Sequence, residues 1–212
     1  MLNIFKIKVF FFAPLIKFIL KNPGVMKSKL FLKAMLIFPK MVSKTYDKKI
    51  DRSGPDYHKA LEAGLTHIFN KPKEIIDLCT GTGFSAFKTA EFFPSSSIEA
   101  IDQITEMLDI ARGKAQKSGN TNINFKIGNA AKLNYENNRF DFIVTSNAPI
   151  YLSEAVRVLK HEGLLLVVFS FSGDAFVTME VHIAKYLKNS GIALLKMESI
   201  GNGVYILGQK TR

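Results

Sequence analysis

The chain lacks the covalent and metal cross-links that hold many small proteins together. Its 212 residues include one cysteine, Cys79, so no internal disulfide can form. Together with four histidines, that cysteine shows no spacing typical of a structural zinc site, and we expect no metal. Stability must therefore come from packing, and a reducing, cytoplasmic setting fits best.

Long apolar runs are also missing. The longest lysine-free stretch near the start, residues 9–16, is about eight residues long, whereas a membrane-spanning helix needs about 20. Lys17 and Lys21 follow this stretch where a secretory signal would show small residues and a cleavage site. We therefore expect this segment to be neither a membrane-spanning helix nor a secretory signal.

Acidic residues are nearly absent from the first 50 positions. This segment holds eleven lysines and one acid, Asp47, so it carries +10 of the formal net charge of +11 and leaves +1 for the rest. The whole chain is 47% hydrophobic and 22% charged, which is typical of a folded protein. We therefore predict a basic, amphipathic N-terminal helical arm over residues 1–50 and one domain over residues 51–212.

Lysines and apolar residues alternate at helical spacing in this arm, which predicts two short helices joined around residues 22–24. Their apolar faces could pack on the domain. Alternatively, they could lie on an anionic membrane surface, where buried apolar area and lysines act together. A nucleic acid is the weaker candidate partner because the arm contains no arginine, the residue best suited to phosphate and base contacts.

From residue 51 onward, helical and strand patterns alternate. This alternation predicts an α/β fold with a doubly wound, mostly parallel sheet and a C-terminal antiparallel hairpin. The expected helices cover residues 57–69, 84–93, 104–117, 153–159 with a serine cap, and 176–189. The expected strands cover residues 74–79, 97–102, 124–127, 140–145, 164–170, 193–200 and 204–210.

A glycine-rich turn, Thr80-Gly81-Thr82-Gly83, follows the first strand and allows a ligand to approach the backbone closely. It lacks the full G-x-G-x-x-G pattern, and alone it could simply be a tight turn. Asp102 ends the next strand about 20 residues later, at the spacing that suits a ribose. Polar residues also end the following strands, which predicts a ligand crevice at their carboxyl ends.

Five segments in this order, IIDLCTGTGF, IEAIDQITEMLDIARGKA, IGNAAKL, FDFIVTSN and RVLKHEG, resemble the class I S-adenosylmethionine-dependent methyltransferases. The resemblance runs from about residue 46 to residue 210 and is strongest to the group that includes the ubiquinone/menaquinone biosynthesis methyltransferases. It implies a Rossmann-like, seven-stranded sheet and S-adenosyl-L-methionine as the cofactor. Its departures are Cys79 for a glycine, Asn129 for an aspartate, and His161-Glu162-Gly163 as the turn after the fifth helix.

The resemblance also implies roles for individual residues. Asp102 would bind the ribose hydroxyls, Gln103 would lie beside the adenine, and Asn129 with the Ala130 backbone would meet the adenine amine edge. Tyr46 would close over the cofactor. The methionine part would lie near Asp77, Cys79, Thr80, Gly81, Gly83 and Thr145.

Methyl transfer needs alignment of the acceptor with the cofactor, and no residue in the sequence identifies itself as a catalytic base. Candidate acceptor-site residues are Tyr57, Asn147 and Tyr151, the last two within Asn-Ala-Pro-Ile-Tyr, which distantly resembles the Asn-Pro-Pro-Tyr element of amino-group methyltransferases. We interpret His58, His67 and His182 as surface or packing residues.

The predicted function is methyl transfer to a small, apolar or membrane-associated acceptor by in-line displacement. Only the arm is available to cover the acceptor site, since the links between the later elements are short. Two alternatives stay open: a methyltransferase of RNA or protein that docks through the basic arm, and a non-catalytic cofactor-binding protein.

Overall fold

The structure is a computed structural model that describes residues 56–171 and 173–211, together with residues 22, 25, 28 and 54. The helices expected in the arm, the boundary at residue 50 and Tyr46 all lie outside the described residues. The elements in chain order are α3 (Asp56–Thr66), β1 (Glu74–Leu78), α4 (Phe84–Phe92), β2 (Ser97–Asp102), α5 (Thr105–Ser118), β3 (Ile123–Ile127), β4 (Phe140–Ser146), α6 (Leu152–Val158), β5 (Leu159–Phe169), α7 (Gly173–Val177), α8 (Glu180–Asn189), β6 (Ile192–Ile200) and β7 (Gly203–Lys210).

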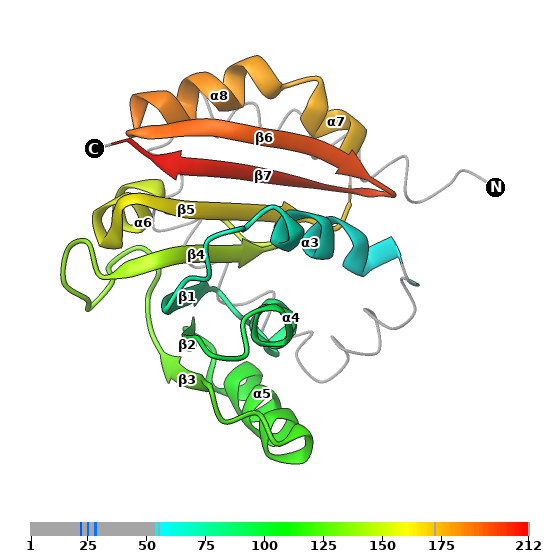
Figure 1. Ribbon diagram of the computed structural model, residues 1–212, viewed down its shortest axis with the longest axis vertical. Helices are drawn as coiled ribbons and strands as arrows, with labels where there is room; N and C mark the ends of the chain where they lie inside the picture. The colour runs from blue at the N-terminus through cyan, green and yellow to red at the C-terminus, as the bar shows by residue number, and fades with distance from the viewer. Residues whose placement is uncertain are drawn as a thin grey trace.

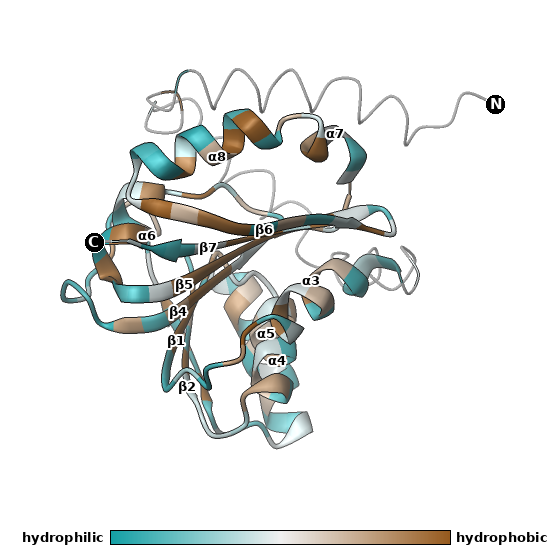
Figure 2. Ribbon diagram, turned by 45° about the horizontal axis from the view of Figure 1, so that its top comes forward, coloured by the Kyte–Doolittle hydropathy of each residue, from teal (hydrophilic) through white to brown (hydrophobic). Residues whose placement is uncertain are grey.

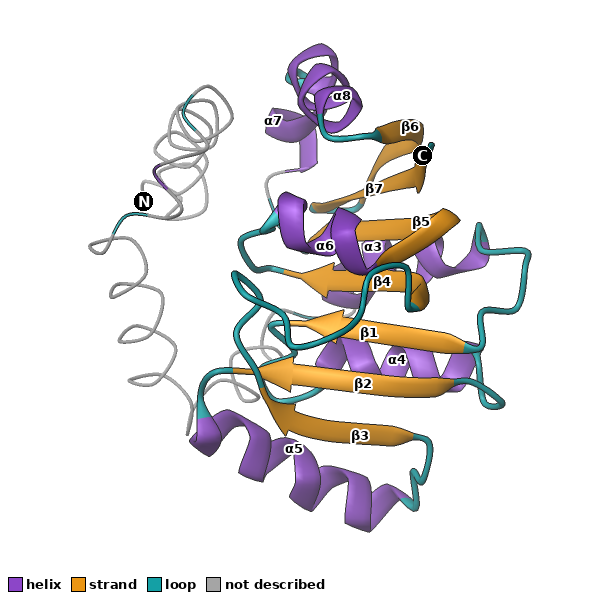
Figure 3. Ribbon diagram, turned by 90° about the vertical axis from the view of Figure 1, so that its left-hand side faces the viewer, coloured by secondary structure: helices purple, strands orange, loops and turns teal. Residues whose placement is uncertain are grey.

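The strands form one seven-stranded sheet in the order β3-β2-β1-β4-β5-β7-β6 (Figure 1). Strands β1 to β5 pair in parallel, and β7 pairs antiparallel to both β5 and β6. The predicted α/β sheet with a C-terminal antiparallel hairpin is therefore confirmed. Figure 3 shows that β1, β2 and β4 end at the same edge of the sheet, which is where the predicted site residues follow them.

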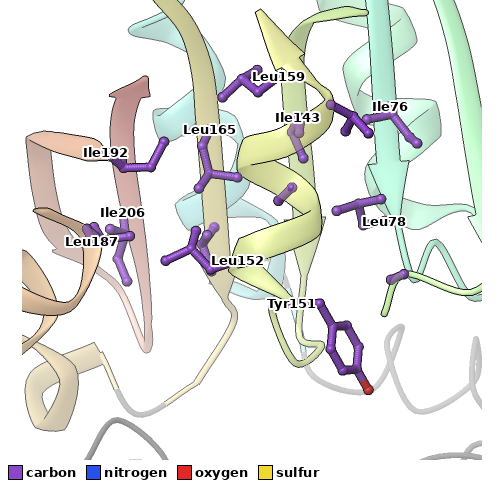
Figure 4. Packing of buried hydrophobic residues seen from close by; sticks show 14 of the residues in the cluster. Ile76, Leu78, Ile143, Tyr151, Leu152, Leu159, Leu165, Leu187, Ile192 and Ile206 are labelled. Atoms are coloured by element: carbon purple, nitrogen blue, oxygen red, sulfur yellow. The ribbon is translucent and has the colours of Figure 1, made fainter. Parts of the chain in front are cut away.

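Each face of the sheet carries its own apolar core, because successive side chains of a strand point to opposite faces. On one face, Ile75 of β1 packs with residues of α3, α4 and α5. On the other, its neighbour Ile76 belongs to a core that extends across the sheet to residues of α6, α7 and α8 (Figure 4). The central strands are accordingly hydrophobic along their length (Figure 2), as expected of a sheet covered on both sides.

The expected serine cap at residue 153 is wrong. Helix α6 begins at Leu152, its N-cap is Tyr151, and no side chain caps it. Leu152 and Ala155 are both buried against the sheet, and this packing determines where the helix begins. Ser153 lies inside the first turn and its hydroxyl does not serve as the cap.

The single helix expected over residues 176–189 is also wrong, because α7 and α8 are separate. The break lies at residues 178–179, where the Met179 amide bonds to the Phe176 carbonyl in a tight turn. Gly173 at the start of α7 lies so close to the hairpin that a Cβ there would be 2.2 Å from the Gly203 carbonyl oxygen. With α7 held at this point, the chain must bend before α8 can place Ile183 and Leu187 in the core.

Two further boundaries differ from expectation. Helix α3 ends at Thr66 rather than residue 69, and the amides of His67 and Ile68 bond three residues back instead of continuing the helix. Residues 161–163 form no turn between α6 and β5, because β5 begins directly at Leu159. Residues 161–163 instead lie within β5, where the β4–β5 pairing is irregular: Phe140 pairs with Leu159, and Phe142 pairs with Leu164. Glu162 in this irregular stretch has a φ of 60°.

Candidate functional site

The glycine loop connects β1 to α4 through three residues in the left-handed region. Cys79, Gly81 and Gly83 have φ values of 58°, 56° and 87°. The Thr80 amide bonds to the Ile101 carbonyl of β2 at 2.9 Å, which holds the loop against the neighbouring strand. The loop therefore turns sharply over the end of β1 and delivers the chain into α4 at Phe84.

The two loop glycines differ in their surroundings. A Cβ on Gly83 would lie 2.7 Å from the Phe87 ring and 3.2 Å from the Phe125 ring, so this glycine serves packing of α4 against the sheet. A Cβ on Gly81 would meet nothing within 4 Å. Cys79 has almost the same φ, so backbone conformation alone does not demand glycine at position 81. Open space at Gly81 fits a ligand that approaches the backbone there.

Asp77 lies beneath the loop with its side chain fully buried. Its carboxylate accepts hydrogen bonds from the Thr80 hydroxyl at 2.5 Å and the Ser85 hydroxyl at 2.8 Å. Burial raises the pKa of Asp77 to about 7, although these hydroxyls oppose the rise. Asp77 thus stabilises the loop conformation through its hydrogen bonds to Thr80 and Ser85.

Ser85 was missed by sequence reasoning. A serine in the first turn of a helix points back toward the helix N-terminus, and this direction could have identified it as a partner for Asp77.

Asp102 ends β2 beside the loop. Its carboxylate accepts the Gly81 amide at 2.8 Å and the Ile104 amide at 2.9 Å. Burial raises the pKa of Asp102, and the backbone amides oppose that rise. Each carboxylate oxygen has a further lone pair, so both can still accept hydrogen bonds from a ligand's hydroxyl groups. Gln103 follows and is exposed.

Asn129 and Ala130 follow β3 at the same edge. The Asn129 side-chain oxygen accepts the Ala131 amide at 2.9 Å, and Asn129 forms a bridge with Lys132, so the residue stabilises its own turn. Ala130 is buried and Asn129 is exposed. Because the side-chain oxygen of Asn129 stabilises the turn, its side-chain NH₂ is the group left to contact a ligand. An aspartate at this position would have no such donor.

At the end of β4, Thr145 is buried and its hydroxyl donates to the Leu78 carbonyl at 2.9 Å, joining the ends of β4 and β1. Asn147 follows with a φ of 55°. Its side-chain NH₂ donates to the Tyr57 hydroxyl at 2.8 Å and the Ser170 hydroxyl at 3.1 Å, and its oxygen accepts the Ser170 amide at 2.8 Å. The structure thus brings together two predicted acceptor-site residues that are 90 positions apart.

Ser170 was not predicted as a site residue. It directly follows the apolar strand β5, and a polar residue at the carboxyl end of a parallel strand is the signal that could have found it. Together with Tyr57 and Asn147 it forms what we call the Asn147 cluster.

Tyr151, the third acceptor-site candidate, is buried at one end of the core formed with α6 (Figure 4). Burial raises the pKa of Tyr151 to about 12, and burial also raises the pKa of the nearby Cys79 thiol well above its usual range. Both groups therefore stay protonated at neutral pH, and neither suits the role of a base. Within the described part of the chain, no cluster of side chains has the composition of a metal site.

Comparison with curated proteins finds two informative relatives. The chain is 36% identical over 102 residues to a demethylmenaquinone methyltransferase of Lactococcus lactis, covering 44% of this chain and 40% of the relative. It is 30% identical over 149 residues to a release factor glutamine methyltransferase of Aliivibrio fischeri, covering 67% of this chain and 51% of that protein. The chain thus spans about half the length of the curated relatives it matches.

Among solved structures, an S-adenosylmethionine-dependent methyltransferase of Aquifex aeolicus has the same fold. The two superpose with a TM-score of 0.63 at 20% identity, covering 77% of this chain and 98% of the other. A family model described as a methyltransferase domain matches residues 69–198, more than half of the chain and all of the strands that carry the glycine loop, Asp102 and Asn129. The chain therefore belongs to the methyltransferase domain family.

Proposed function

We propose that the protein transfers a methyl group from S-adenosyl-L-methionine to a small, apolar or membrane-associated acceptor. The observation that carries this proposal is the open space at Gly81, bordered by the Asp102 carboxylate that binds the Gly81 amide. In an open α/β sheet, ligands bind beyond the carboxyl ends of the strands, which is where this space lies.

The residues present suit this cofactor. Asp102 can accept hydrogen bonds from the ribose hydroxyls, and Asn129 can donate one to the adenine edge. Asp102 is a partly buried carboxylate, and its negative charge favours a cationic ligand such as a sulfonium. The loop residues Cys79, Gly81 and Gly83, with Thr145 beneath, would hold the methionine part. Tyr46 is proposed as its cover.

When bound, the cofactor supplies an activated methyl group, so the protein's own residues mainly need to align the acceptor and exclude water. The Asn147 cluster offers hydroxyl and amide groups at the ends of β4 and β5 for this alignment. Aromatic rings lie next to it along the chain: Phe169 stacks on Phe176 with centroids 4.4 Å apart, and Tyr57 packs edge-on to Phe84. This mixture of apolar rings and a few polar groups favours an apolar acceptor with a polar end.

A quinone-like acceptor fits this mixture, and the name of the Lactococcus lactis relative supports it. Such acceptors dissolve in membranes. The eleven lysines and numerous apolar residues of residues 1–50 would hold the protein peripherally on the cytoplasmic face of an anionic membrane. Among the residues that the structure describes, no helix combines the length and apolar character needed to cross a bilayer.

Methylation of a protein glutamine is a second candidate, favoured by the name of the Aliivibrio fischeri relative and by the Asn-Ala-Pro-Ile-Tyr segment. Against it, the Asn147 side chain is held on both its oxygen and its nitrogen by Ser170 and Tyr57. An asparagine engaged in this way is a poor receptor for a substrate amide. RNA ranks lower because the arm has no arginine.

Radiolabelled methyl transfer tests these candidates against one another. The full chain is incubated with labelled S-adenosyl-L-methionine and one of three acceptors: a demethylmenaquinol in anionic vesicles, a purified release factor, or total RNA. We expect label in the lipid fraction and its loss with Asp102→Ala. Label only in the release factor or only in RNA would contradict the proposed acceptor class.

Vesicle co-sedimentation tests the membrane contact separately. The full chain should sediment with vesicles rich in phosphatidylserine, and a variant with Lys6, Lys8, Lys17 and Lys21 changed to glutamine should sediment less. Equal sedimentation of the two proteins would contradict a role for the arm's charge.

A further inference from the structure

Tyr151 lies at the carboxyl edge of the sheet, in the link between β4 and α6. Ser146 ends β4, and Leu152 begins α6. The ring of Tyr151 belongs to the core on the α6 face, and the residue as a whole is 6% exposed. Figure 4 shows this ring extending beyond Leu78 and Leu152, with the hydroxyl oxygen at its tip. Packing therefore fixes the ring, and the hydroxyl points away from the core.

The hydroxyl of Tyr151 has no hydrogen-bond partner in the described part of the chain. Other tyrosines differ. The hydroxyl of Tyr205, which is also buried, donates to Glu198 at 2.8 Å. The hydroxyl of Tyr135 donates to Glu99 at 3.2 Å. Buried tyrosines usually pair their hydroxyl groups, because an unpaired one costs free energy, so the exception at Tyr151 calls for a partner.

A ligand can reach this hydroxyl. Among the described residues, the buried side-chain atoms that lack both a partner and solvent exposure are His58 Nδ1 and Thr89 Oγ1. The Tyr151 oxygen also lacks a partner but is not one of these atoms, so it keeps accessible surface. A ligand can therefore contact the oxygen without displacing the buried ring.

The surroundings of this hydroxyl make it a hydrogen-bond donor beside apolar groups. Cys79 of the glycine loop lies close enough to affect the titration of Tyr151, and Cys79 and Ile150 pack against the same core as its ring. Burial raises the pKa of Tyr151 to about 12, so the hydroxyl keeps its proton at neutral pH and can donate it to a ligand oxygen in a hydrogen bond. The site thus offers an O–H donor in a largely apolar wall.

The sheet order places this donor on the acceptor's side of the glycine loop. The residues proposed for the adenine and ribose follow β3 and β2, whereas Tyr151 follows β4, on the other side of β1. Asn147 and Ser170, proposed to align the acceptor, follow β4 and β5. Tyr151 therefore borders both the loop proposed to hold the methionine part and the segment proposed to align the acceptor.

An aromatic acceptor with a hydroxyl group suits such a donor. Phenols and quinols become better methyl acceptors when they lose the hydroxyl proton. A hydrogen bond donated to their oxygen strengthens once that oxygen is negatively charged. The bond therefore stabilises the anion and lowers the pKa of the acceptor. Its O–H bond can then break with the proton passing to water, so ionisation of the acceptor requires no base from Tyr151 or Cys79.

We propose that the methyl acceptor is an aromatic ring bearing a hydroxyl group, and that the Tyr151 hydroxyl donates a hydrogen bond to the oxygen of that group. This inference rests on the proposed function, because it requires an acceptor site beside the glycine loop. It narrows the proposed apolar acceptors to phenols and quinols and makes Tyr151 the residue that recognises their oxygen.

Binding of two aromatic probes to the full chain, saturated with S-adenosylhomocysteine, tests the inference. The probe 2-naphthol carries a ring hydroxyl, and 2-methylnaphthalene has a methyl group of similar size in its place. Tyr151→Phe removes the hydroxyl and keeps the ring. Tyr186→Phe is the matched control, because burial also raises the pKa of Tyr186 but its helix, α8, precedes β6 and does not follow β4.

The ratio of the affinities for 2-naphthol and 2-methylnaphthalene should fall about tenfold from the wild type to Tyr151→Phe. The pKa of bound 2-naphthol, followed by its absorbance, should be about one pH unit lower in the wild type than in this variant. Tyr186→Phe should match the wild type in both measurements. Both variants should bind S-adenosylhomocysteine within about twofold of the wild type, and Tyr151→Phe should keep the wild-type urea midpoint because no described group loses a partner.

An unchanged affinity ratio and an unchanged pKa of bound 2-naphthol in Tyr151→Phe would overturn the role of Tyr151. Weaker binding of S-adenosylhomocysteine with an unchanged ratio would also overturn it, because Tyr151 would then bind the cofactor. A wild-type chain that binds S-adenosylhomocysteine but neither probe would contradict the proposed apolar acceptor, and one that does not bind S-adenosylhomocysteine would contradict the proposed function. These failures are therefore distinguishable in one set of titrations.

Discussion

The carboxylate of Asp102 accepts a hydrogen bond from the backbone amide of Gly81 at 2.8 Å, although the two residues are 21 positions apart. This bond joins the end of β2 to the loop that follows β1. One side chain thereby both fixes the loop and borders the open space at Gly81. Loop shape and ligand binding are therefore coupled through Asp102.

That coupling predicts a graded response at position 102. Asp102→Asn keeps an oxygen that can accept the Gly81 amide but loses the negative charge, whereas Asp102→Ala loses both. We expect S-adenosylhomocysteine to bind less tightly in the order wild type, Asp102→Asn, Asp102→Ala, with the last weakened by about 1.5 kcal/mol or more. Calorimetric titration measures the three affinities, and equal affinities for wild type and Asp102→Ala would contradict the assignment.

The two loop glycines should separate binding from stability. Gly83→Ala places a Cβ against the Phe87 ring at a φ of 87°, so the free energy of unfolding should fall by about 2 kcal/mol. Gly81→Ala meets no neighbouring atom and should cost only about 1 kcal/mol of backbone strain. Its Cβ would occupy the proposed ligand space, so binding should weaken at least about tenfold.

Urea unfolding and calorimetric binding of both variants check this pair. A Gly81→Ala variant that binds the cofactor with wild-type affinity would contradict the account. It would also be contradicted by Gly81→Ala being the less stable of the two variants.

Asp77 predicts a pH dependence of stability. Burial raises its pKa from 3.8 to about 7, so between these values the folded chain holds a proton that the unfolded chain has released. Its contribution to stability is therefore fully present below about pH 4 and is lost as pH rises through 7. Within that window the free energy of unfolding should fall by up to about 1.4 kcal/mol per pH unit from this group.

Asp77→Asn removes the titrating proton while keeping an oxygen for Thr80 and Ser85. Urea unfolding at several pH values should therefore show a flatter profile for this variant between pH 4 and 7. A variant profile parallel to that of the wild type would assign the pH dependence to other groups.

The hydrogen bond between Tyr57 and Asn147 should appear as a coupling energy. It ties α3 to the ends of β4 and β5, and each partner can be removed with its backbone conformation kept, by Tyr57→Phe and Asn147→Gly. The double variant should lose about 1 kcal/mol less stability than the sum of the losses of the two single variants. A double-mutant cycle in urea measures this, and strictly additive losses would mean that the bond is not formed in solution.

The order and type of most elements could be predicted from sequence because local patterns determine them. The glycine turn after residues 74–78 and the left-handed Gly119 after α5 are local signals, and both lie where expected. The start of α6 could not be predicted, because burial of Leu152 outweighs the capping preference of Ser153. The break between α7 and α8 depends on contact between Gly173 and Gly203, which are 30 positions apart.

The candidate site divides in the same way. Asp102 and Gly81 follow from spacing along the chain, but their direct hydrogen bond does not. The Asn147 cluster joins three separate segments of the chain through side chains. Tyr57 and Asn147 could therefore be predicted only as separate candidates, and Ser170 was not predicted. The Tyr151 hydroxyl lacks a partner in the described part of the chain, which is a property of the folded environment that no pattern in the sequence reports.

Calorimetric titration of the full chain with S-adenosyl-L-methionine tests the central claim most directly. The account predicts saturable binding of one molecule per chain, weakened by Asp102→Ala and by Gly81→Ala. Absence of measurable binding at about 1 mM cofactor, where even a weak site would be half occupied, would contradict it.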